Sequence, residues 1–128
     1  MAEKITGILI DVEHEIAHVV TINRELEEYY KLLNCQLIEI VSRKIGNRIY
    51  DIICDEEGAL KDKPKISAIN DLGMPILVGN LFIVNYDGID NEISLTQSDI
   101  DYIMPFIQKQ ATRKYPRPYP MLQQCDHV

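Results

Sequence analysis

The sequence has 128 residues, a formal net charge of −7 and 46% hydrophobic residues. That length suits one domain with a buried core, and no stretch approaches the ~18 consecutive apolar residues of a membrane helix. The negative charge argues against general binding to nucleic acid or to an anionic membrane. The three cysteines, Cys35, Cys54 and Cys125, are odd in number and lack C-x-x-C spacing. We therefore expect a reducing cytoplasm and neither a disulfide framework nor a zinc site.

Two β-rich segments open the chain. Lys4–Val12 and Glu15–Ile22 are separated by polar residues, which predicts an antiparallel hairpin. His14 and His18 lie four residues apart, but no third metal ligand is evident, so surface histidines are the default interpretation and no metal is expected.

A helix is predicted over Arg24–Leu33, with Asn23 as its N-cap. Asn34 suits the turn that ends the helix. Four apolar or aromatic residues at helical spacing predict one buried face, which makes the tyrosines packing residues: Leu26, Tyr29, Tyr30 and Leu33.

A second hairpin is predicted from Gln36–Ile45 and Arg48–Asp55, because Gly46-Asn47 is a two-residue turn signal. Three basic residues crowd that turn: Arg43, Lys44 and Arg48. They form a second candidate set of phosphate ligands, although exposed charges at strand ends also keep sheet edges soluble.

The apolar run Leu77–Tyr86 is bounded by turn residues and predicts a single strand buried on both faces. Within it, we expect Gly79 to permit a close backbone approach. The preceding connector, Ala59–Asp71, is predicted to contain a helical turn at Ser67–Asn70, and a loop is predicted at Ile89–Ser94.

Thr96 and Asp99 have the spacing of a capping box, which predicts the start of a second helix. Pro105 predicts an end or a kink near Met104. These elements indicate an α+β fold, with a mostly antiparallel sheet of about five to six strands and two helices. We expect a domain over residues 1–111 and an extended basic, Pro- and Tyr-rich tail over 112–128, which packs on the body or on a neighbouring subunit.

The charge is unevenly divided along the chain. Between Gln108 and Pro120 there are four basic residues and no acid, so the remainder carries −11 (−7 less +4). An acidic body with focal basic patches fits a small anionic ligand better than a polyanion, although a basic tail that is simply solvated explains the same pattern.

No motif for catalysis stands out: the chain has no Gly-rich phosphate loop, nucleophile elbow or metal-spaced Cys/His set. Asp51 and Asp55 share a strand face, but strand-end polarity explains them equally well. We therefore expect no enzyme activity and no cofactor.

A nucleotide site needs cations for phosphates, a planar group for the base and amides for base edges and ribose hydroxyls. The chain supplies such a set, with Phe82 as the stacking residue and Lys109 as a further cation: Arg24, Phe82, Asn85, Asn91, Lys109, Arg113 and Lys114. This composition is compatible with a site but does not demand one.

Three stretches carry a resemblance to a known family: Tyr50–Asn70, Leu77–Val84 and Ser94–Ile103. Their pattern, D-I-I-C-D-x-E-G … S-A-I … G-N-L-F-I … S-L-T-x-x-D-I, resembles a small phage and prophage domain of unknown function. Within that group the chain looks like the viral Thoeris anti-defence family of the first type described. Its members are cytosolic sponges that sequester cyclic ADP-ribose isomers made by bacterial TIR-domain immune proteins, and some also bind cyclic oligonucleotides of the CBASS system.

The resemblance implies a homodimer or hexamer in the cytoplasm of an infected bacterial host, with ligand sites shared between subunits. It places Phe82 and the loop of Asn91 in the pocket, with Arg24 and Arg113 on the phosphates. Two other functions remain open: an acidic inhibitor that binds a host defence or restriction enzyme, and a hydrolase that cleaves the same signal. An acidic inhibitor could act by mimicking DNA, which requires carboxylates along an exposed face. Because the acids are scattered through turns and helix starts, this mimicry is the weaker alternative.

Overall fold

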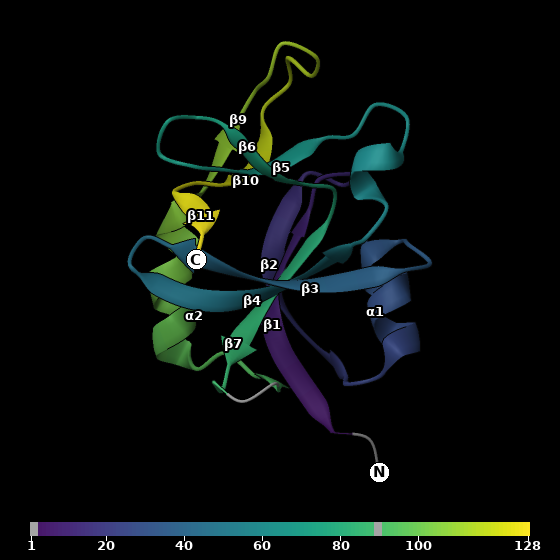
Figure 1. Cartoon of the computed structure of the whole chain (residues 1–128), viewed down its shortest axis with the longest axis vertical. Coiled ribbons are helices and arrows are strands. Elements are labelled where there is room, and N and C mark those ends of the chain that lie inside the picture. Colours follow the sequence, from purple (N-terminus) through teal and green to yellow (C-terminus); the bar gives the residue numbers. More distant parts are fainter. Residues whose placement is uncertain (1–2, 89–90) are drawn as a thin grey trace.

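In the computed structural model, which describes residues 3–88 and 91–128, the chain folds into two β-sheets and two α-helices (Figure 1). Sheet A has the order β11-β3-β4-β7-β1-β2, with β8 beside β7, and sheet B has the order β6-β5-β10-β9. The strands are β1 (Lys4–Asp11), β2 (Ile16–Asn23), β3 (Ile38–Ile45), β4 (Arg48–Asp55), β5 (Ile66–Ile69), β6 (Pro75–Val78), β7 (Leu81–Tyr86), β8 (Glu92–Ile93), β9 (Ile107–Gln110), β10 (Tyr119–Leu122) and β11 (Cys125–His127). The α+β class and the mostly antiparallel pairing are confirmed, but the predicted single sheet is divided into two.

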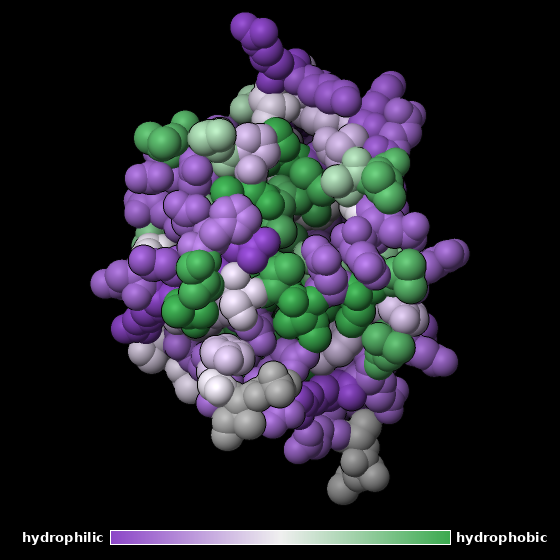
Figure 2. Space-filling model, viewed as in Figure 1, coloured by the Kyte–Doolittle hydropathy of each residue, from purple (hydrophilic) through white to green (hydrophobic). Residues whose placement is uncertain are grey.

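The central strands of sheet A, β1, β4 and β7, are mostly buried on both faces, which explains their near-continuous apolar sequences. Helix α1 (Leu26–Leu33) packs Tyr29 and Leu33 against one face. Sheet B and α2 (Gln97–Ile103) close the other face over a larger core. Part of the outer surface stays apolar: Ile40 and Ile49 are each 44% exposed, and Figure 2 shows apolar surface in the middle of the view in which β3 and β4 lie in front. No helix in the described residues is long and apolar enough to cross a membrane.

Both predicted hairpins are confirmed. β1 and β2 pair from Lys4 opposite Asn23 to Asp11 opposite Ile16. β3 and β4 pair around Gly46-Asn47, where Gly46 has φ +62°. Glycine suits this turn because the left-handed conformation costs it nothing.

The run predicted as one strand, Leu77–Tyr86, is two strands in two different sheets. β6 belongs to sheet B and β7 to sheet A, so the chain changes sheets at Gly79-Asn80. Gly79 has φ +77°, and a Cβ added there would meet no atom within 4 Å. The glycine is therefore explained by its backbone conformation and not by the predicted close approach. The buried Asn80 side chain stabilises the corner at which the chain changes sheets, because its Oδ1 accepts a hydrogen bond of 3.0 Å from Val12 N.

The start of the first helix was predicted wrongly. Asn23 is the last residue of β2, and α1 begins at Leu26 after Glu25, which makes no side-chain capping bond. Leu26 is 53% exposed, so it does not belong to the buried face, whereas Tyr29 and Leu33 do. The predicted turn at Asn34 is confirmed by its φ of +51°.

The second helix follows its local signals. Thr96 Oγ1 accepts from Asp99 N at 3.2 Å, and Asp99 Oδ2 accepts from Thr96 N at 2.9 Å, which completes the predicted capping box. The α-helix ends at Ile103, and a 3₁₀ turn over Met104–Phe106 holds Pro105. Proline cannot donate the next helical hydrogen bond, so it sets this end.

Three segments differ from expectation, wholly or in part. The helical turn predicted at Ser67–Asn70 is wrong, because β5 occupies Ile66–Ile69. The predicted loop at Ile89–Ser94 begins in residues 89–90, which lie outside the described residues, and continues into β8. The predicted tail, 112–128, packs on the body, which is one of the two places expected for it, but it does so as strands of the two sheets: β10 lies between β5 and β9, and β11 pairs with β3. Only residues 111–118 protrude, as the tip of the β9–β10 hairpin (Figure 1).

Candidate functional site

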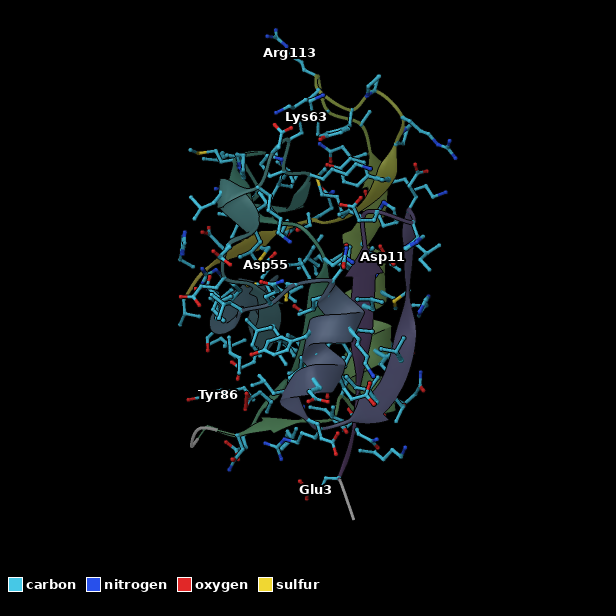
Figure 3. All side chains as sticks on the ribbon, turned by 90° about the vertical axis from the view of Figure 1, so that its right-hand side faces the viewer. Glu3, Asp11, Asp55, Lys63, Tyr86 and Arg113 are labelled. Atoms are coloured by element: carbon cyan, nitrogen blue, oxygen red, sulfur yellow. The ribbon has the colours of Figure 1, made fainter. Side chains whose placement is uncertain are left out.

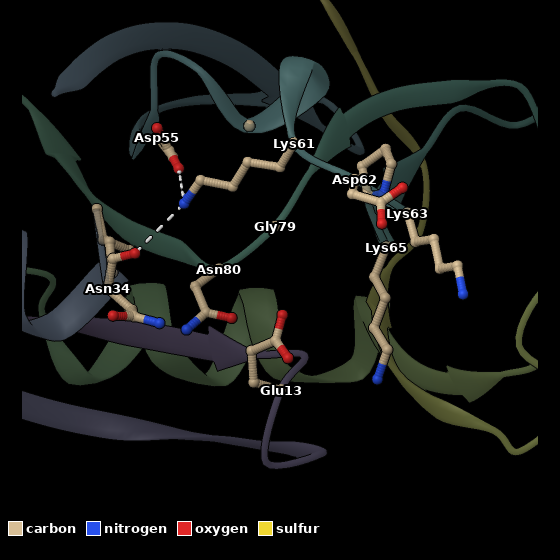
Figure 4. A pocket seen from close by; sticks show the side chains of 12 residues that line it. Glu13, Asn34, Asp55, Lys61, Asp62, Lys63, Lys65, Gly79 and Asn80 are labelled. Atoms are coloured by element: carbon tan, nitrogen blue, oxygen red, sulfur yellow. Dashed lines mark hydrogen bonds and ion pairs between the residues drawn. The ribbon is translucent and has the colours of Figure 1, made fainter. Parts of the chain in front are cut away.

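A polar groove lies at the C-terminal end of α1. It consists of two hollows that share Asn34, Asp55 and Lys61 as lining residues. The larger has a volume of ≈ 590 Å³ and is also lined by Tyr30, Lys31, Cys35, Gln36 and Glu57. The smaller, ≈ 100 Å³, reaches the corner between the two sheets; Figure 4 shows Glu13 and Asn80 there between Lys61 and Lys65.

Lys61 joins three parts of this groove. Its Nζ lies 2.6 Å from Asp55 Oδ2 and donates to the backbone carbonyl of Asn34 at 3.4 Å (Figure 4). The hydrogen bond with Asp55 raises the pKa of the Lys61 ammonium, because the carboxylate favours the charged form. Lys61 is therefore a fixed cation that ties the connector after β4 to the end of α1.

Lys65 and Lys63 connect the groove to the β9–β10 hairpin. Lys65 Nζ donates to Val12 O at 3.2 Å and lies 5.1 Å from the ring centre of Tyr115. The Tyr115 hydroxyl donates to Lys63 O, and the Tyr119 hydroxyl donates to Ile66 O at 2.7 Å. These two tyrosines hold the hairpin against the connector 61–65.

The result is an end of the molecule that is rich in cations, here called the basic end: segments 61–65 and 109–117. These segments hold seven of the thirteen basic residues and one of the twenty acids, Asp62. Figure 3 shows Arg113 at this extremity, with Lys63 just below it. Lys61 pairs with Asp55, and Arg117 pairs with Glu15 at 2.9 Å. Within residues 3–88 and 91–128, the other five form no ion pair: Lys63, Lys65, Lys109, Arg113 and Lys114.

The predicted stacking residue, Phe82, is part of the core. Its side chain is 0% exposed, and its ring lies 6.2 Å from that of Tyr29 beneath α1. No ligand can stack on this ring while the core is closed. The interpretation of Phe82 as a recognition residue is therefore wrong, because its place on β7 points it into the α1 side of the sheet.

The other predicted site residues divide between the two ends of the molecule. Arg24 Nη1 lies 3.1 Å from Glu3 Oε2, and Arg24 Nη2 lies 4.0 Å from Glu92 Oε2. Figure 3 places Glu3 at the opposite extremity from Arg113. One chain therefore brings Lys109, Arg113 and Lys114 to the basic end but not Arg24.

The two predicted amides are held by local structure. Asn85 Nδ2 donates to Asp99 Oδ2 at 2.8 Å, and Asn85 Oδ1 accepts from Tyr86 N at 2.9 Å. Asn91 N donates to Asp87 Oδ1 at 3.2 Å. Asn85 therefore supports the start of α2, and Asn91 lies in the turn after β7.

The second candidate set of phosphate ligands, Arg43, Lys44 and Arg48, is also not brought together in one place. The pairing of β3 with β4 puts Arg43 and Arg48 on one sheet face and Lys44 on the other. Arg48 lies over the Tyr102 ring at 4.2 Å, whereas Arg43 donates to Ser42 O and leaves its buried Nε without a partner among the described residues. These three side chains therefore do not form one phosphate-binding site.

The residues considered for metal binding or acid–base chemistry are engaged separately. His14 Nδ1 lies 2.7 Å from Asp11 Oδ2, and the described residues contain no metal-ligating group of three. Asp51 Oδ1 accepts from Ser42 Oγ at 2.8 Å, whereas Asp55 binds Lys61. Burial raises the pKa of Asp51, with nearby Asp87 acting in the same direction and the Ser42 bond opposing it.

Sequence reasoning missed the connector lysines. Lys61, Lys63 and Lys65 occupy alternate positions in K-D-K-P-K, a visible cationic signal in a segment taken as a plain connector. The pattern could not show that this segment lies close to the β9–β10 hairpin, about 50 residues later in the sequence, because that contact depends on Tyr115 and Tyr119.

Residues 5–108 match the model of a family described as a domain of unknown function (DUF3846). No curated protein and no solved structure matches the chain.

Proposed function

The chain belongs to this family, whose description assigns no activity, and we propose that it binds a small phosphorylated ligand at the basic end and holds it unchanged. The proposed ligands are those that the sequence resemblance implies: cyclic ADP-ribose isomers, with cyclic oligonucleotides as a second class. In this proposal the protein acts in the cytoplasm of an infected bacterium, where it removes a nucleotide immune signal. It is an anti-defence protein and not an enzyme.

The observation that carries this proposal is the gathering of cations without carboxylate partners. Lys63, Arg113 and Lys114 come from two distant segments and are held together by Tyr115. Like charges repel one another, so such a cluster is relieved when an anion binds between them. Phosphate oxygens are strong acceptors for lysine and arginine, and arginine can bind them in a bidentate manner.

The adjoining groove supplies the other groups that a nucleotide needs. Tyr30 presents a partly exposed aromatic ring, and Asn34 and Gln36 are exposed amides beside it. A base can stack on such a ring while amides bind its edge. The volume of ≈ 590 Å³ lies in the range of about 300–1,000 Å³ that is common for small-molecule sites.

The chemistry of Lys61 supports binding over reaction. Because its contact with Asp55 raises its pKa, the amine stays protonated. A protonated amine attracts phosphate but is neither a general base nor a nucleophile.

The test uses the purified full chain with two probes, cyclic ADP-ribose and a cyclic dinucleotide. Each probe is incubated with excess protein, filtered to separate bound from free ligand, and analysed by mass spectrometry before and after heat denaturation. We expect a probe to leave the filtrate and to return intact after heating. New products would identify a hydrolase, and complete recovery without heating for both probes would favour the acidic inhibitor of a host enzyme.

A further inference from the structure

The outer edge of β2 is an unusual feature of sheet A. This eight-residue strand is the last in the sheet order, and within residues 3–88 and 91–128 no strand pairs with its outer side. In Figure 3 it forms the right-hand border of the sheet. Its backbone N–H and C=O groups on that side are thus available for pairing with another strand.

The other sheet edges carry features that hinder pairing, whereas β2 carries none. β11 has three residues and includes Asp126, β6 begins with Pro75, and β9 contains Lys109. Short length, proline and charge are the usual devices that keep an edge from self-association. The sequence of β2, IAHVVTIN, has no Asp, Glu, Lys, Arg, Pro or Gly, and the strand pairs with β1 without a bulge.

We propose that β2 pairs with β2 of a second copy of this chain, antiparallel and about a two-fold axis perpendicular to the sheet. Such an axis keeps each residue on its own face of the sheet, so both copies of α1 lie on the same side. The two copies of sheet A then form one continuous sheet. This interface does not depend on the proposed ligand.

The side chains select one register. With Val19 on the axis, Val19 faces Val19 of the partner subunit, and Ile16 faces Ile22 of the partner subunit. Ile16 and Val19 are each 43% exposed in the single chain, so pairing removes apolar surface from water. The neighbouring register, with Val20 on the axis, would place Ile16 opposite Arg24 and Val19 opposite Thr21 of the partner subunit. These two exposed apolar side chains would then lose their apolar partners, which disfavours that register.

The first test measures the molar mass of the full chain in solution by light scattering and sedimentation. We expect a dimer, and we expect Val19→Lys to halve the mass while leaving the circular dichroism spectrum unchanged. The matched control is Ile49→Lys, which also puts a lysine at an apolar position of nearly equal exposure (44%, against 43% for Val19), on β4 and away from this edge. A monomeric wild type, or loss of the dimer in Ile49→Lys but not in Val19→Lys, would overturn the proposal.

A second test reads the register directly. In the Val19-centred dimer, Val19→Cys places two thiols opposite each other, where cross-strand Cβ atoms are ~4.5–5.5 Å apart. His18→Cys leaves its two thiols on a diagonal of about 7–8 Å, beyond the reach of an unstrained disulfide. After removal of reductant, we expect a disulfide-linked dimer from Val19→Cys and far less from His18→Cys or from the wild type. Equal cross-linking of the two variants, or none from Val19→Cys, would contradict this register.

Discussion

The two ends of the molecule both contain basic residues, but they use them differently. At one end Arg24 contacts Glu3 and Glu92, so its charge is compensated within the chain. At the basic end Lys63, Arg113 and Lys114 have no carboxylate partner among the described residues. The comparison shows that a cation's availability depends on its neighbours in space, which a list of basic residues does not reveal.

The difference has a simple physical origin. Arg24 follows β2 directly and lies beside the chain's first described residues and β8, which supply acids. The hairpin tip 111–118 projects beyond both sheets, and Tyr115 joins it to another lysine-rich segment. Its one ion pair among the described residues is that of Arg117 with Glu15. The first arrangement compensates charge within the chain, whereas the second leaves positive charge uncompensated at the surface.

The largest expected effect concerns Phe82, whose side chain is buried in the core. We expect Phe82→Ala to lower the free energy of unfolding by about 3–5 kcal/mol, because it empties space under α1. Urea denaturation measures this loss. Tyr86→Ala, at the 40% exposed end of the same strand, is the control and should cost much less. Equal losses in the two variants would contradict the assignment of Phe82 to packing.

The next effect tests the basic end itself. Lys63→Gln and Arg113→Gln should each weaken binding of cyclic ADP-ribose or a cyclic dinucleotide by about 1–3 kcal/mol, the value of a charge-assisted hydrogen bond. Titration calorimetry gives these affinities. Arg24→Gln and Lys4→Gln remove the same charge elsewhere and should leave affinity nearly unchanged. If Arg24→Gln weakened binding as much as Arg113→Gln, the site would have to combine both ends, for instance from two subunits.

Gly79 links the groove to the change of sheet. Because its φ is +77°, Gly79→Ala should lower the free energy of unfolding by about 1–2 kcal/mol through backbone strain. Thermal unfolding measures the change. Gly79→Asn should lose less, since asparagine tolerates this conformation better. An alanine variant as stable as the wild type would show that the corner can relax.

The smallest expected effect concerns Asp99, which supports α2 and binds Asn85. Burial alone would raise the pKa of Asp99, but hydrogen bonds from the Thr96 backbone and side chain and from Tyr50 lower it below its usual value of 3.8. Its contribution is therefore complete above about pH 3.8 and is lost as the pH falls through the lower, folded-state pKa.

Asp99→Asn should cost about 1 kcal/mol at pH 7 and should reduce the loss of stability on acidification. Denaturation at several pH values between 7 and 2 checks both effects. Asp101→Asn, an exposed position on the same helix, is the matched control and should follow the wild type. If Asp99→Asn lost as much stability on acidification as the wild type, Asp99 would not be the group responsible for that loss.

Local signals in the sequence were enough for several elements. The turn at Gly46-Asn47 and the capping box of Thr96 and Asp99 act within four residues, so the pattern itself contains the interacting groups. The α+β class follows from the same local patterns. The N-cap at Asn23 failed because pairing with Lys4 extends β2 through that residue, a contact that outweighs the local capping preference.

Tertiary structure alone decided the path of Leu77–Tyr86 and the composition of the candidate site. An apolar run has the same pattern whether it fills one strand or crosses from sheet B to sheet A, because burial is favourable in both. Phe82 became a core residue only through the position of α1, and the connector lysines met the β9–β10 hairpin only through Tyr115 and Tyr119. The sequence by itself therefore determined which chemical groups are present, and long-range packing determined which of them lie together at the basic end.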